Sequence, residues 1–466
     1  LQQFTPEDAY ELIIVDNGST DGTVEYLRNL ENVRCIFNSE NKGFVRGNNQ
    51  AIQMLEGTRD VILLNNDTEI PHDQGDWVAR LQQTAYSSTD IGIVGCRLRQ
   101  PNGYLQHAGA YMPLQTFWGQ QIGSMELDVN QYGYDRDVES VVFACAYIKR
   151  ELIARIGMLS EDYFSYFEDT DYCLRAREEG YRTVCCGEVT LIHYENASTR
   201  ENKVSHSDFF DVSQATFRRK WETKLTKRYQ RKLVWLSTVT RPHGYAMTSK
   251  DILLGLDTSH VEVAYRYLYG KGTVFPVEEP ENVDYYNINT MKQRPIPPRV
   301  PHVVYGQGDA FEANRGAYKI GYTMLEVTGL PDEWVRQANL MDEVWVPSRF
   351  NRKTFRESGV TRPIHVMPLG VDTNYFNPRI RSFPVTDEFA FLTVFEWGER
   401  KAPETLLKTF NSTFRAEDPV VLLCKANVTD PSVDIRAVLN DLHLSPQGGR
   451  IEFILNKYLP YHQLGS

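Results

Sequence analysis

The sequence has little of what would place it in several large protein classes. It has no apolar run near the roughly 18 residues that a membrane-spanning helix requires, and its first residues lack the pattern of a secretory signal. It also lacks a surplus of positive charge, since the formal net charge is −11 at pH 7. Nucleic-acid-binding proteins usually carry a basic footprint, so no nucleic-acid partner is expected.

Cysteine and glycine motifs are equally scarce. The seven cysteines are scattered, odd in number, and never form a C-x-x-C pair. This arrangement argues against a disulfide framework or a zinc site and favours a reducing compartment. A nicotinamide dehydrogenase is disfavoured too, because the stretch GQGDAF at 306–311 holds only a lone Gly-x-Gly.

What is present is an ordinary globular composition in a long chain. Hydrophobic residues make up 41% of the 466 residues and charged residues 24%, as in soluble globular proteins. At about 150 residues per domain, this length predicts about three domain-sized units. The chain begins shortly before its first apolar run and stops at PYHQLGS without a closing element, so we expect a fragment of a larger protein.

Short apolar runs alternate with helical patterns in the N-terminal part, residues 1–200. Strands are expected at 12–15, 33–37, 61–64 and 91–98, and this βαβ alternation predicts a parallel sheet with crossover helices. The basic, aromatic segment 201–250 is expected to be a helical connector. The α/β pattern then resumes over 251–376 and, after a polar linker, over 377–466.

The stretch VILLNNDTEI at 61–70 runs from four apolar residues straight into Asn65, Asn66 and Asp67. The apolar part is typical of a buried strand. In open α/β sheets ligands bind just beyond the carboxyl ends of strands, so these polar side chains are candidates for a binding site. The plain alternative is a strand that leaves the sheet through a turn, where Asn and Asp are common.

Further acids and a histidine stand in comparable places. Asp16 follows the run LIIV, Glu168, Asp169 and Asp171 lie in YFEDTDYCLR, and His193 follows VTLI. Together they could hold a hard divalent cation and leave one carboxylate as a base. Individually each has a simpler explanation, because Asp16 can cap a turn, the acids can complement a helix dipole, and a lone histidine is usually structural.

Five blocks in order carry a family resemblance: VDNGSTDGT, NKGFVRGNNQAI, ILLNNDTEI, GYLQHAGA and YFEDTDYCLRAREEGYRTV…LIHYENAS. Together they closely resemble the family-2 glycosyltransferases in their rhamnosyltransferase-like branch, over about residues 10–200. The resemblance implies a GT-A (nucleotide-diphospho-sugar transferase-like) fold. It also implies an inverting transfer of a sugar from a nucleotide-sugar donor to a hydroxyl of a glycan or lipid-linked acceptor, in bacterial surface polysaccharide synthesis on the cytoplasmic side.

The resemblance also assigns roles on the donor side. Asp16 would contact the nucleobase, and Asn65, Asn66 and Asp67 stand at the family's Asp-x-Asp motif. Asp67 would bind the metal, Mg²⁺ or Mn²⁺, that bridges the diphosphate, with His193 as a further ligand. Two departures matter: Asn65 replaces the first acid of the motif, and the family's first strand would have to precede the residues given.

On the acceptor side, the resemblance makes Asp169 the catalytic base. Glu168 and Asp171 would position the acceptor and its loop. A carboxylate in this role takes the proton of the attacking hydroxyl.

The C-terminal half carries a second resemblance. The segments at 305–360, 365–378 and 391–410 look like the family-4 glycosyltransferases of the GT-B fold. Arg400 and Lys401 match that family's basic pair for donor diphosphate, although solvated charges at a helix start are the simpler reading. Glu326 would face the cleft in an unassigned role. The family's Glu-x7-Glu motif would fall beyond Ser466, so we expect an incomplete GT-B double-Rossmann unit without activity of its own.

Three alternatives stay open. The strand before Asp16 superficially matches a haloacid-dehalogenase-type phosphatase, but positions 17 and 18 are Asn and Gly, where that motif places its second acid. A catalytically inactive nucleotide-sugar-binding or scaffold fragment is the more serious rival, because both halves look incomplete. The basic helix at 217–235 could also make peripheral membrane contact, against the simpler reading of a surface or connecting helix.

Overall fold

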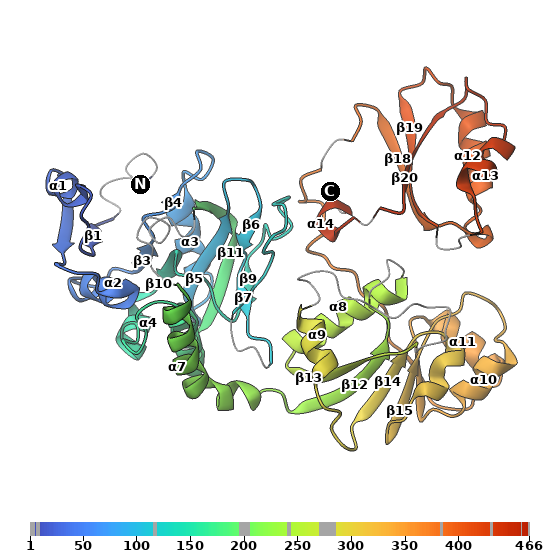
Figure 1. Ribbon diagram of the computed structural model, residues 1–466, viewed down its shortest axis with the longest axis horizontal. Helices are drawn as coiled ribbons and strands as arrows, with labels where there is room; N and C mark the ends of the chain where they lie inside the picture. The colour runs from blue at the N-terminus through green and yellow to red at the C-terminus, as the bar shows by residue number, and fades with distance from the viewer. Residues whose placement is uncertain are drawn as a thin grey trace.

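The computed structural model describes residue 5 and residues 10–114, 119–194, 206–239, 244–269, 286–382, 385–428, 432–457 and 459–464. Its elements form three groups, which Figure 1 shows as an N-terminal unit, a middle unit and a smaller C-terminal unit. Among the described residues, the N-terminal unit contains three separate sheets, and the other two units contain one sheet each.

The main sheet of the N-terminal unit has the strand order β3-β10-β5-β11-β4. These strands are β3 (Val61–Leu64), β10 (Cys145–Ile148), β5 (Ile91–Arg99), β11 (Arg182–His193) and β4 (Thr68–Glu69), with β6 (Leu105–His107) on β5 and β9 (Arg136–Val138) on β11. Only β5 and β11 pair in parallel. The expected all-parallel sheet is therefore wrong, because β10 returns after a long excursion and inserts antiparallel between β3 and β5.

A two-stranded parallel sheet lies beside the main one. It consists of β1 (Leu12–Asp16) and β2 (Val33–Phe37), with α1 (Thr23–Arg28) and α2 (Gly43–Gln53) following the two strands. Among the described strands, β1 pairs only with β2 and β3 pairs only with β10. The edges of β1 and β3 are thus both open, a point that shapes the cavity described below.

Helices cover both faces of the main sheet. On one face α3 (Trp77–Tyr86) packs Trp77, Leu81 and Ala85 into a core with β5 and β11. The opposite core receives α2, α4 (Arg150–Ile156), α5 (Glu168–Glu178) and α7 (His206–Thr226). Short strands β7 (Ala110–Tyr111) and β8 (Gln120–Gln121) form a separate pair.

Helix α7 belongs to the N-terminal unit. Phe217, Trp221 and Leu225 recur every four residues, so they share one helix face, and all three are buried in the core beside α5. The basic residues around these three side chains were the reason that the sequence predicted a connector here. The expected boundary near residue 200 therefore differs from the structure, in which the N-terminal core extends through Tyr229.

The middle unit is a six-stranded parallel sheet with the order β13-β12-β14-β15-β16-β17. The strands are β12 (Arg231–Ser237), β13 (Val261–Tyr267), β14 (Pro301–Tyr305), β15 (Tyr318–Tyr322), β16 (Glu343–Val346) and β17 (Ile364–Val366). The helices are α8 (Gly244–Thr258), α9 (Tyr286–Gln293), η3 (Gly308–Ala313), α10 (Asp332–Ala338) and α11 (Arg349–Glu357). This unit begins at β12, inside the segment that was expected to be a connector.

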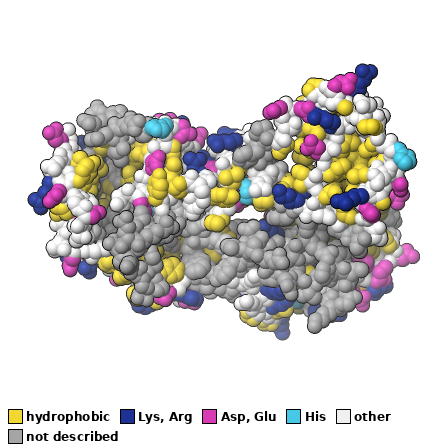
Figure 2. Space-filling view, turned by 45° about the horizontal axis from the view of Figure 1, so that its top comes forward, with side chains coloured by type: hydrophobic (Ala, Val, Ile, Leu, Met, Phe, Trp, Pro, Cys, Tyr) yellow, Lys and Arg dark blue, Asp and Glu magenta, His cyan; other side chains and the backbone are white. Residues whose placement is uncertain are grey.

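The C-terminal unit has three parallel strands, β18 (Phe389–Glu396), β19 (Val420–Asn427) and β20 (Arg450–Leu455). Its helices are η4 (Glu399–Lys401), α12 (Pro403–Thr413), α13 (Ile435–Asp441) and α14 (Tyr461–Leu464). The apolar strand β18 lies at an edge, and Phe389 and Leu392 are 66% and 62% exposed. Figure 2 shows hydrophobic side chains gathered over this end of the molecule.

Polar contacts join the N-terminal unit to the segment that runs from β17 to β18. The hydroxyl groups of Tyr132 and Tyr375 lie 2.6 Å apart, and both contact the Glu126 carboxylate. Arg136 donates to Asn374 at 2.6 Å. Within the described ranges, every helix is too short or too polar to span a lipid bilayer.

Candidate active site

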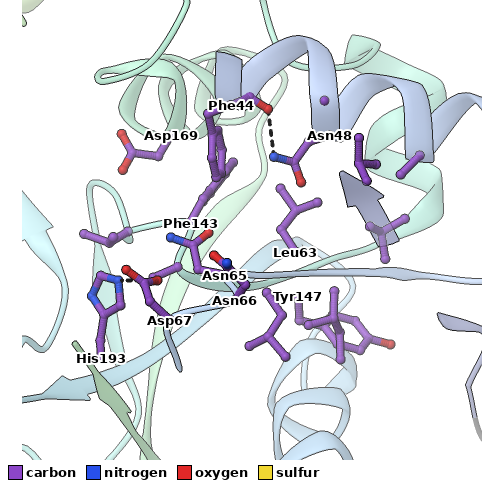
Figure 3. Close-up of a pocket in the computed structure, with 18 of the residues that line it drawn as sticks. Phe44, Asn48, Leu63, Asn65, Asn66, Asp67, Phe143, Tyr147, Asp169 and His193 are labelled. Carbon is purple, nitrogen blue, oxygen red and sulfur yellow. Dashed lines mark hydrogen bonds and ion pairs between the residues drawn. The ribbon is translucent and has the colours of Figure 1, made fainter. Parts of the chain in front are cut away.

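A cavity of about 2500 Å³ lies between the open edges of β1 and β3. Every residue of both strands lines it, and α2 and α3 contribute further side chains. The strand edges and helices supply apolar walls, whereas the residues that follow β1 and β3 are polar. Asn65, Asn66, Asp67, Asp169 and His193 all line this cavity, and Figure 3 shows the Asp67 side chain pointing towards His193.

Backbone pairing brings Asp67 to His193. The backbone N–H of Asn65 donates to Ala144 O at 2.9 Å, and the chain then turns into β4. Strand β4 pairs antiparallel with β11, which places Thr68 opposite His193, and Tyr194 N donates to Asp67 O at 2.9 Å. The turn after β3 is thus tied to the residue before β10 on one side of Asp67 and to the end of β11 on the other.

The Asp67 carboxylate is enclosed and only partly satisfied. Its Oδ1 lies 3.2 Å from His193 Nε2, and the two side chains are 16% and 8% exposed. Oδ1 has no partner in hydrogen-bond geometry among the described residues. The nearby His193 holds the pKa of Asp67 below its usual value, and burial works against that shift.

These donors fit a divalent cation that takes further ligands from a substrate. Carboxylate oxygen and imidazole nitrogen are both common ligands, and Mg²⁺ sites often use one or two carboxylates completed by substrate phosphates. Over the part of the chain that the structure describes, no three His, Cys, Asp or Glu side chains converge as a ligand set. The orphaned Asp67 oxygen therefore points to an open, incomplete site rather than a closed cage.

Two histidines lie next to each other here and have different surroundings. His193 Nδ1 lies 2.7 Å from Gln106 Oε1 on β6. His107 Nδ1 contacts Gln121 Oε1, and its Nε2 accepts from Val142 N at 3.3 Å. Burial lowers the pKa of His107 to about 4, so this ring is neutral at physiological pH. The segment GYLQHAGA contributes to the family resemblance, but nothing in its sequence marks Gln106 as a site residue.

Asp16 lies at the end of β1 and lines the cavity. Its Oδ2 accepts hydrogen bonds from Gly18 N and Ser19 N, both at 3.2 Å, so the turn-capping explanation holds locally. Asn17 fastens the same loop to the start of α2, where its Nδ2 donates to Gly43 O at 3.1 Å. A capped, anchored loop at the cavity wall is compatible with a contact to a ligand.

The first turn of α5 carries two carboxyl groups on the cavity wall, Glu168 and Asp169. Tyr166 and Phe167, which precede them, both have left-handed φ values, 68° and 67°, a sparsely populated conformation for bulky residues. Burial, and then the neighbouring Asp169, raise the pKa of Glu168 to about 8, and Glu168 Oε2 has no hydrogen-bond partner within the described ranges. Burial also raises the pKa of Asp169.

Asp171 has a different environment and does not line the cavity. Its side chain is fully buried, and it accepts from Arg175 Nε at 3.0 Å and Trp221 Nε1 at 2.8 Å. Lys220 Nζ lies 2.6 Å from Oδ1, the oxygen that also accepts from Trp221, whereas Arg175 donates to Oδ2. Asp171 therefore joins α5 to α7, and any effect on the acceptor loop has to act through this anchor.

Arg400 and Lys401 lie in η4 of the C-terminal unit, outside the cavity. Arg400 Nη1 is 3.6 Å from Glu326 Oε1 of the middle unit, and these side chains are 68% and 66% exposed. The structure thus brings together the two C-terminal features that sequence reasoning named separately. It does not bring them to Asp67.

Cations of the basic segment 217–235 are engaged within the protein. Lys224 pairs with Glu178 at 2.5 Å, and Arg228 pairs with Glu139 at 2.6 Å. Lys220 contacts Asp171, as described above. These ion pairs, together with the burial of Phe217 and Trp221, give no support to the alternative of a peripheral membrane contact.

The N-terminal part of the chain is similar to known proteins. Residues 1–157 match a family model described as Glycosyl transferase family 2. The chain is 30% identical to the O-antigen biosynthesis protein RfbC of Myxococcus xanthus over 37% of this chain and 13% of that protein. It is 25% identical to an N-acetylglucosaminyl-diphospho-decaprenol L-rhamnosyltransferase of Mycobacterium tuberculosis over 43% of this chain and 71% of that one.

Other similarities are partial. An uncharacterised protein of Sinorhizobium fredii is 30% identical over 46% of this chain and 24% of its own length. The chain thus spans 24% and 13% of the length of two of its curated relatives. A structure of GalNAc-T7 with UDP, GalNAc and Mn²⁺ is 13% identical, with a TM-score of 0.34 over 41% of this chain and 39% of that chain. A mannosyltransferase from Pyrobaculum calidifontis in complex with GDP-Man and Mn²⁺ is 20% identical, with a TM-score of 0.29 over 41% and 49%.

Proposed function

Because residues 1–157 carry a glycosyltransferase family 2 domain, we propose that the chain is a metal-dependent, inverting glycosyltransferase. It would move a sugar from a nucleotide-sugar donor to a hydroxyl group of a glycan or lipid-linked acceptor. The observation that carries this proposal is the enclosed, unsatisfied Asp67 oxygen beside His193, in the same cavity as Asp169.

The donor side of the reaction would use the residues that follow β1 and β3. Asp16 would contact the nucleobase, and Asn65 and Asn66 would contact the donor beside Asp67. Asp67 and His193 would hold a divalent cation, which when bound supplies Lewis-acid neutralisation of the charge on the departing diphosphate. The pairing of β4 with β11 brings these two side chains within 3.2 Å of each other, which supports this assignment.

The acceptor side would use the first turn of α5. Asp169 would take the proton of the acceptor hydroxyl while its oxygen attacks the anomeric carbon opposite the leaving group, which inverts the configuration. Glu168 is the rival for this role. Its pKa of about 8 keeps it protonated at neutral pH, so it suits a hydrogen-bond donor to the acceptor better than a base.

The names of the relatives suggest the class of acceptor. One relative is named for O-antigen biosynthesis, and another for a diphospho-decaprenol acceptor. A surface-polysaccharide intermediate, glycan or lipid-linked, is therefore our proposal. Nucleotide sugars are made in the cytoplasm, so the reaction would take place there.

We propose that the C-terminal half is a family-4, GT-B-type unit. Two sheets made entirely of parallel strands agree with that fold class. The exposed Arg400 and Lys401 would contact the donor diphosphate of such a unit.

A second candidate is a nucleotide-sugar-binding protein without catalysis. It is favoured by the volume of the cavity, about 2500 Å³, which exceeds the roughly 300–1,000 Å³ of an ordinary ligand pocket and leaves more room around a donor. The two candidates predict the same donor binding and differ only in turnover.

Turnover of a nucleotide-sugar panel by the full chain tests the proposal. UDP-, GDP- and dTDP-sugars would be supplied with a lipid-linked glycan acceptor, with and without Mn²⁺, and release of nucleoside diphosphate would be measured. Metal-dependent release with at least one donor supports the transferase. Donor binding without release in every combination supports the binding protein instead.

A further inference from the structure

We propose that Glu139 is a positioning residue that holds Asp169, the proposed base, in place, and that the middle unit in turn holds Glu139. The proposed transferase site of the N-terminal unit then depends on the middle unit for its geometry. The inference rests on the proposed function only where it refers to turnover. The contacts that carry it are independent of any reaction.

The backbone that follows Glu139 reaches the site. Residues 140–144 all line the cavity. Burial raises the pKa of Asp169, and a hydrogen bond from the backbone N–H of Phe143 works against that shift. The last carbonyl of the same stretch accepts from Asn65 N at 2.9 Å. This stretch therefore contacts both the proposed base and the turn after β3.

The Glu139 carboxylate joins separate parts of the N-terminal unit. Its Oε1 accepts from Arg177 Nη1 at 3.1 Å and from Arg228 Nη1 at 2.6 Å. Its Oε2 accepts from the backbone N–H of Met112. The side chain is only 11% exposed, so these contacts are largely shielded from water. Arg177 belongs to α5, so Glu139 is tied directly to the helix that carries the proposed base.

The middle unit supplies a further contact to the same oxygen. His260, in the turn between α8 and β13, places Nε2 3.4 Å from Glu139 Oε1. Its ring packs edge-on against Tyr229, with the ring centroids 5.4 Å apart. The backbone N–H of His260 donates to Asp257 O at 3.0 Å, which closes the turn that presents the ring. His260 therefore reaches Glu139 from a constrained backbone position.

A second group of contacts holds the end of α8 against the N-terminal unit. Arg294 Nη2 lies 3.2 Å from Asp257 Oδ1, and both side chains are 1% exposed. The same nitrogen donates to Leu114 O at 3.4 Å. Asn287 Nδ2 donates to Tyr111 OH at 2.6 Å. These contacts join the middle unit to the N-terminal unit at a second point.

A purely structural Glu139 and a positioning Glu139 predict different results. If Glu139 only stabilised the fold, its loss would lower the free energy of unfolding and leave the folded fraction fully active. If it positions Asp169, its loss should lower kcat as well. The KM for the donor should change little, because Asp67 and His193 are brought together by the pairing of β4 with β11.

Glu139→Gln in the full chain separates the two cases, since it keeps the shape of the side chain and removes its charge. We expect kcat to fall by about 2–30-fold, the usual range for residues that couple to a site without touching its ligand, and donor KM to change by less than about twofold. Amide hydrogen exchange, measured by mass spectrometry, should become faster in α5 and in residues 140–144.

Asp128→Asn is the matched control. Asp128 is another largely buried carboxylate, 8% exposed and 2.9 Å from Arg97, and neither residue lines the cavity. This variant should lose stability through its broken ion pair and keep both the kcat of the folded fraction and the exchange rate of α5.

A pair of variants at His260 tests the part of the middle unit. His260→Leu removes the contact to Glu139, whereas His260→Gln keeps a nitrogen donor at similar reach. Both replacements have to adopt the same left-handed φ of 56°, so backbone strain affects them alike. His260→Leu should lower kcat and speed α5 exchange in the same direction as Glu139→Gln, and His260→Gln should restore most of both. Because His260 is 30% exposed, this pair keeps the test open if Glu139→Gln fails to fold.

Two results would overturn the inference. One is a Glu139→Gln protein whose kcat and α5 exchange match those of Asp128→Asn, and the other is a His260→Leu protein identical to wild type in both measurements. Failure of the proposed function is distinguishable, since it would appear as absent turnover in wild type while α5 exchange still became faster in Glu139→Gln and His260→Leu.

Discussion

The cavity of the N-terminal unit and the basic pair of the C-terminal unit were both identified from family motifs, yet they differ physically. Asp67 and His193 are enclosed, tied by strand pairing, and hold an unsatisfied oxygen. Arg400 is 68% exposed and meets Glu326 at 3.6 Å, a separation at which a solvated ion pair contributes little. A motif becomes a site only where the fold removes water and fixes the side chains.

The largest effect is expected at Asp169, the proposed catalytic base. Asp169→Asn keeps the shape of the side chain and removes its ability to take a proton, so turnover should fall on the order of 10²-fold or more while donor binding survives. Steady-state kinetics and nucleotide-sugar binding would be measured together. Asp162→Asn, an exposed acid in the preceding loop, is the control. Near-normal turnover of Asp169→Asn would remove it from the mechanism.

Two residues further along α5, the same type of side chain should act on stability instead. Asp171→Ala leaves Lys220 and Arg175 without their buried partner, and we expect the free energy of unfolding to fall by about 3 kcal/mol. Denaturant unfolding would measure this loss. If the folded fraction of the variant turned over normally, Asp171 would be an anchor alone. A loss of kcat with unchanged stability would show that Asp171 acts on the acceptor.

The pH dependence of stability tests whether Glu168 is protonated in the folded protein. Its folded pKa of about 8 lies above the usual value of 4.5, so the folded state holds a proton that the unfolded state releases. Between these values a rising pH favours the unfolded state, and the stability present at low pH is lost progressively. Glu168→Gln should flatten this slope in unfolding experiments from pH 5 to about 8. A slope identical to that of wild type would show that Glu168 is ionised in the fold.

The smallest effect is expected in the C-terminal unit. In the full chain, Arg400→Ala combined with Lys401→Ala should change sugar transfer by less than about twofold, because neither residue lines the cavity and exposed charges contribute little. Donor turnover of the double variant would be compared with that of wild type. A large loss would mean that the basic pair serves the reaction after all.

The carboxyl ends of strands were the most predictable part of the site. The apolar run that ends at Leu64 predicts a strand, and the structure has one there. The polar residues that follow it, Asn65, Asn66 and Asp67, line the cavity, as expected for residues just beyond the carboxyl end of a strand in an α/β sheet. The meeting of Asp67 and His193 was implied by the family resemblance. The structure adds the reason, which is the pairing of β4 with β11.

Other features left no readable signal. β10 inserts antiparallel after an irregular stretch that has no periodic pattern, so the mixed sheet could not be foreseen. β12 begins with Arg231 and Lys232, and these charges disguised a strand whose Val234 and Trp235 are buried. The run at Phe389–Glu396 has the composition of a central strand, and composition alone does not reveal that it lies at an edge. Gln106 is an ordinary polar residue until its contact is known.

The central claim is that the end of β3 binds a metal together with a nucleoside diphosphate. Titration of Mn²⁺ into the full chain, with and without UDP or GDP, tests it most directly. With Asp67 and His193 as the main protein ligands, Mn²⁺ should bind weakly alone and much more tightly once diphosphate oxygens are supplied. Asp67→Ala should abolish that gain, and Asn65→Ala should only reduce it. Tight Mn²⁺ binding to the nucleotide-free protein, unchanged by Asp67→Ala, would show that the polar residues after β3 are only a strand exit.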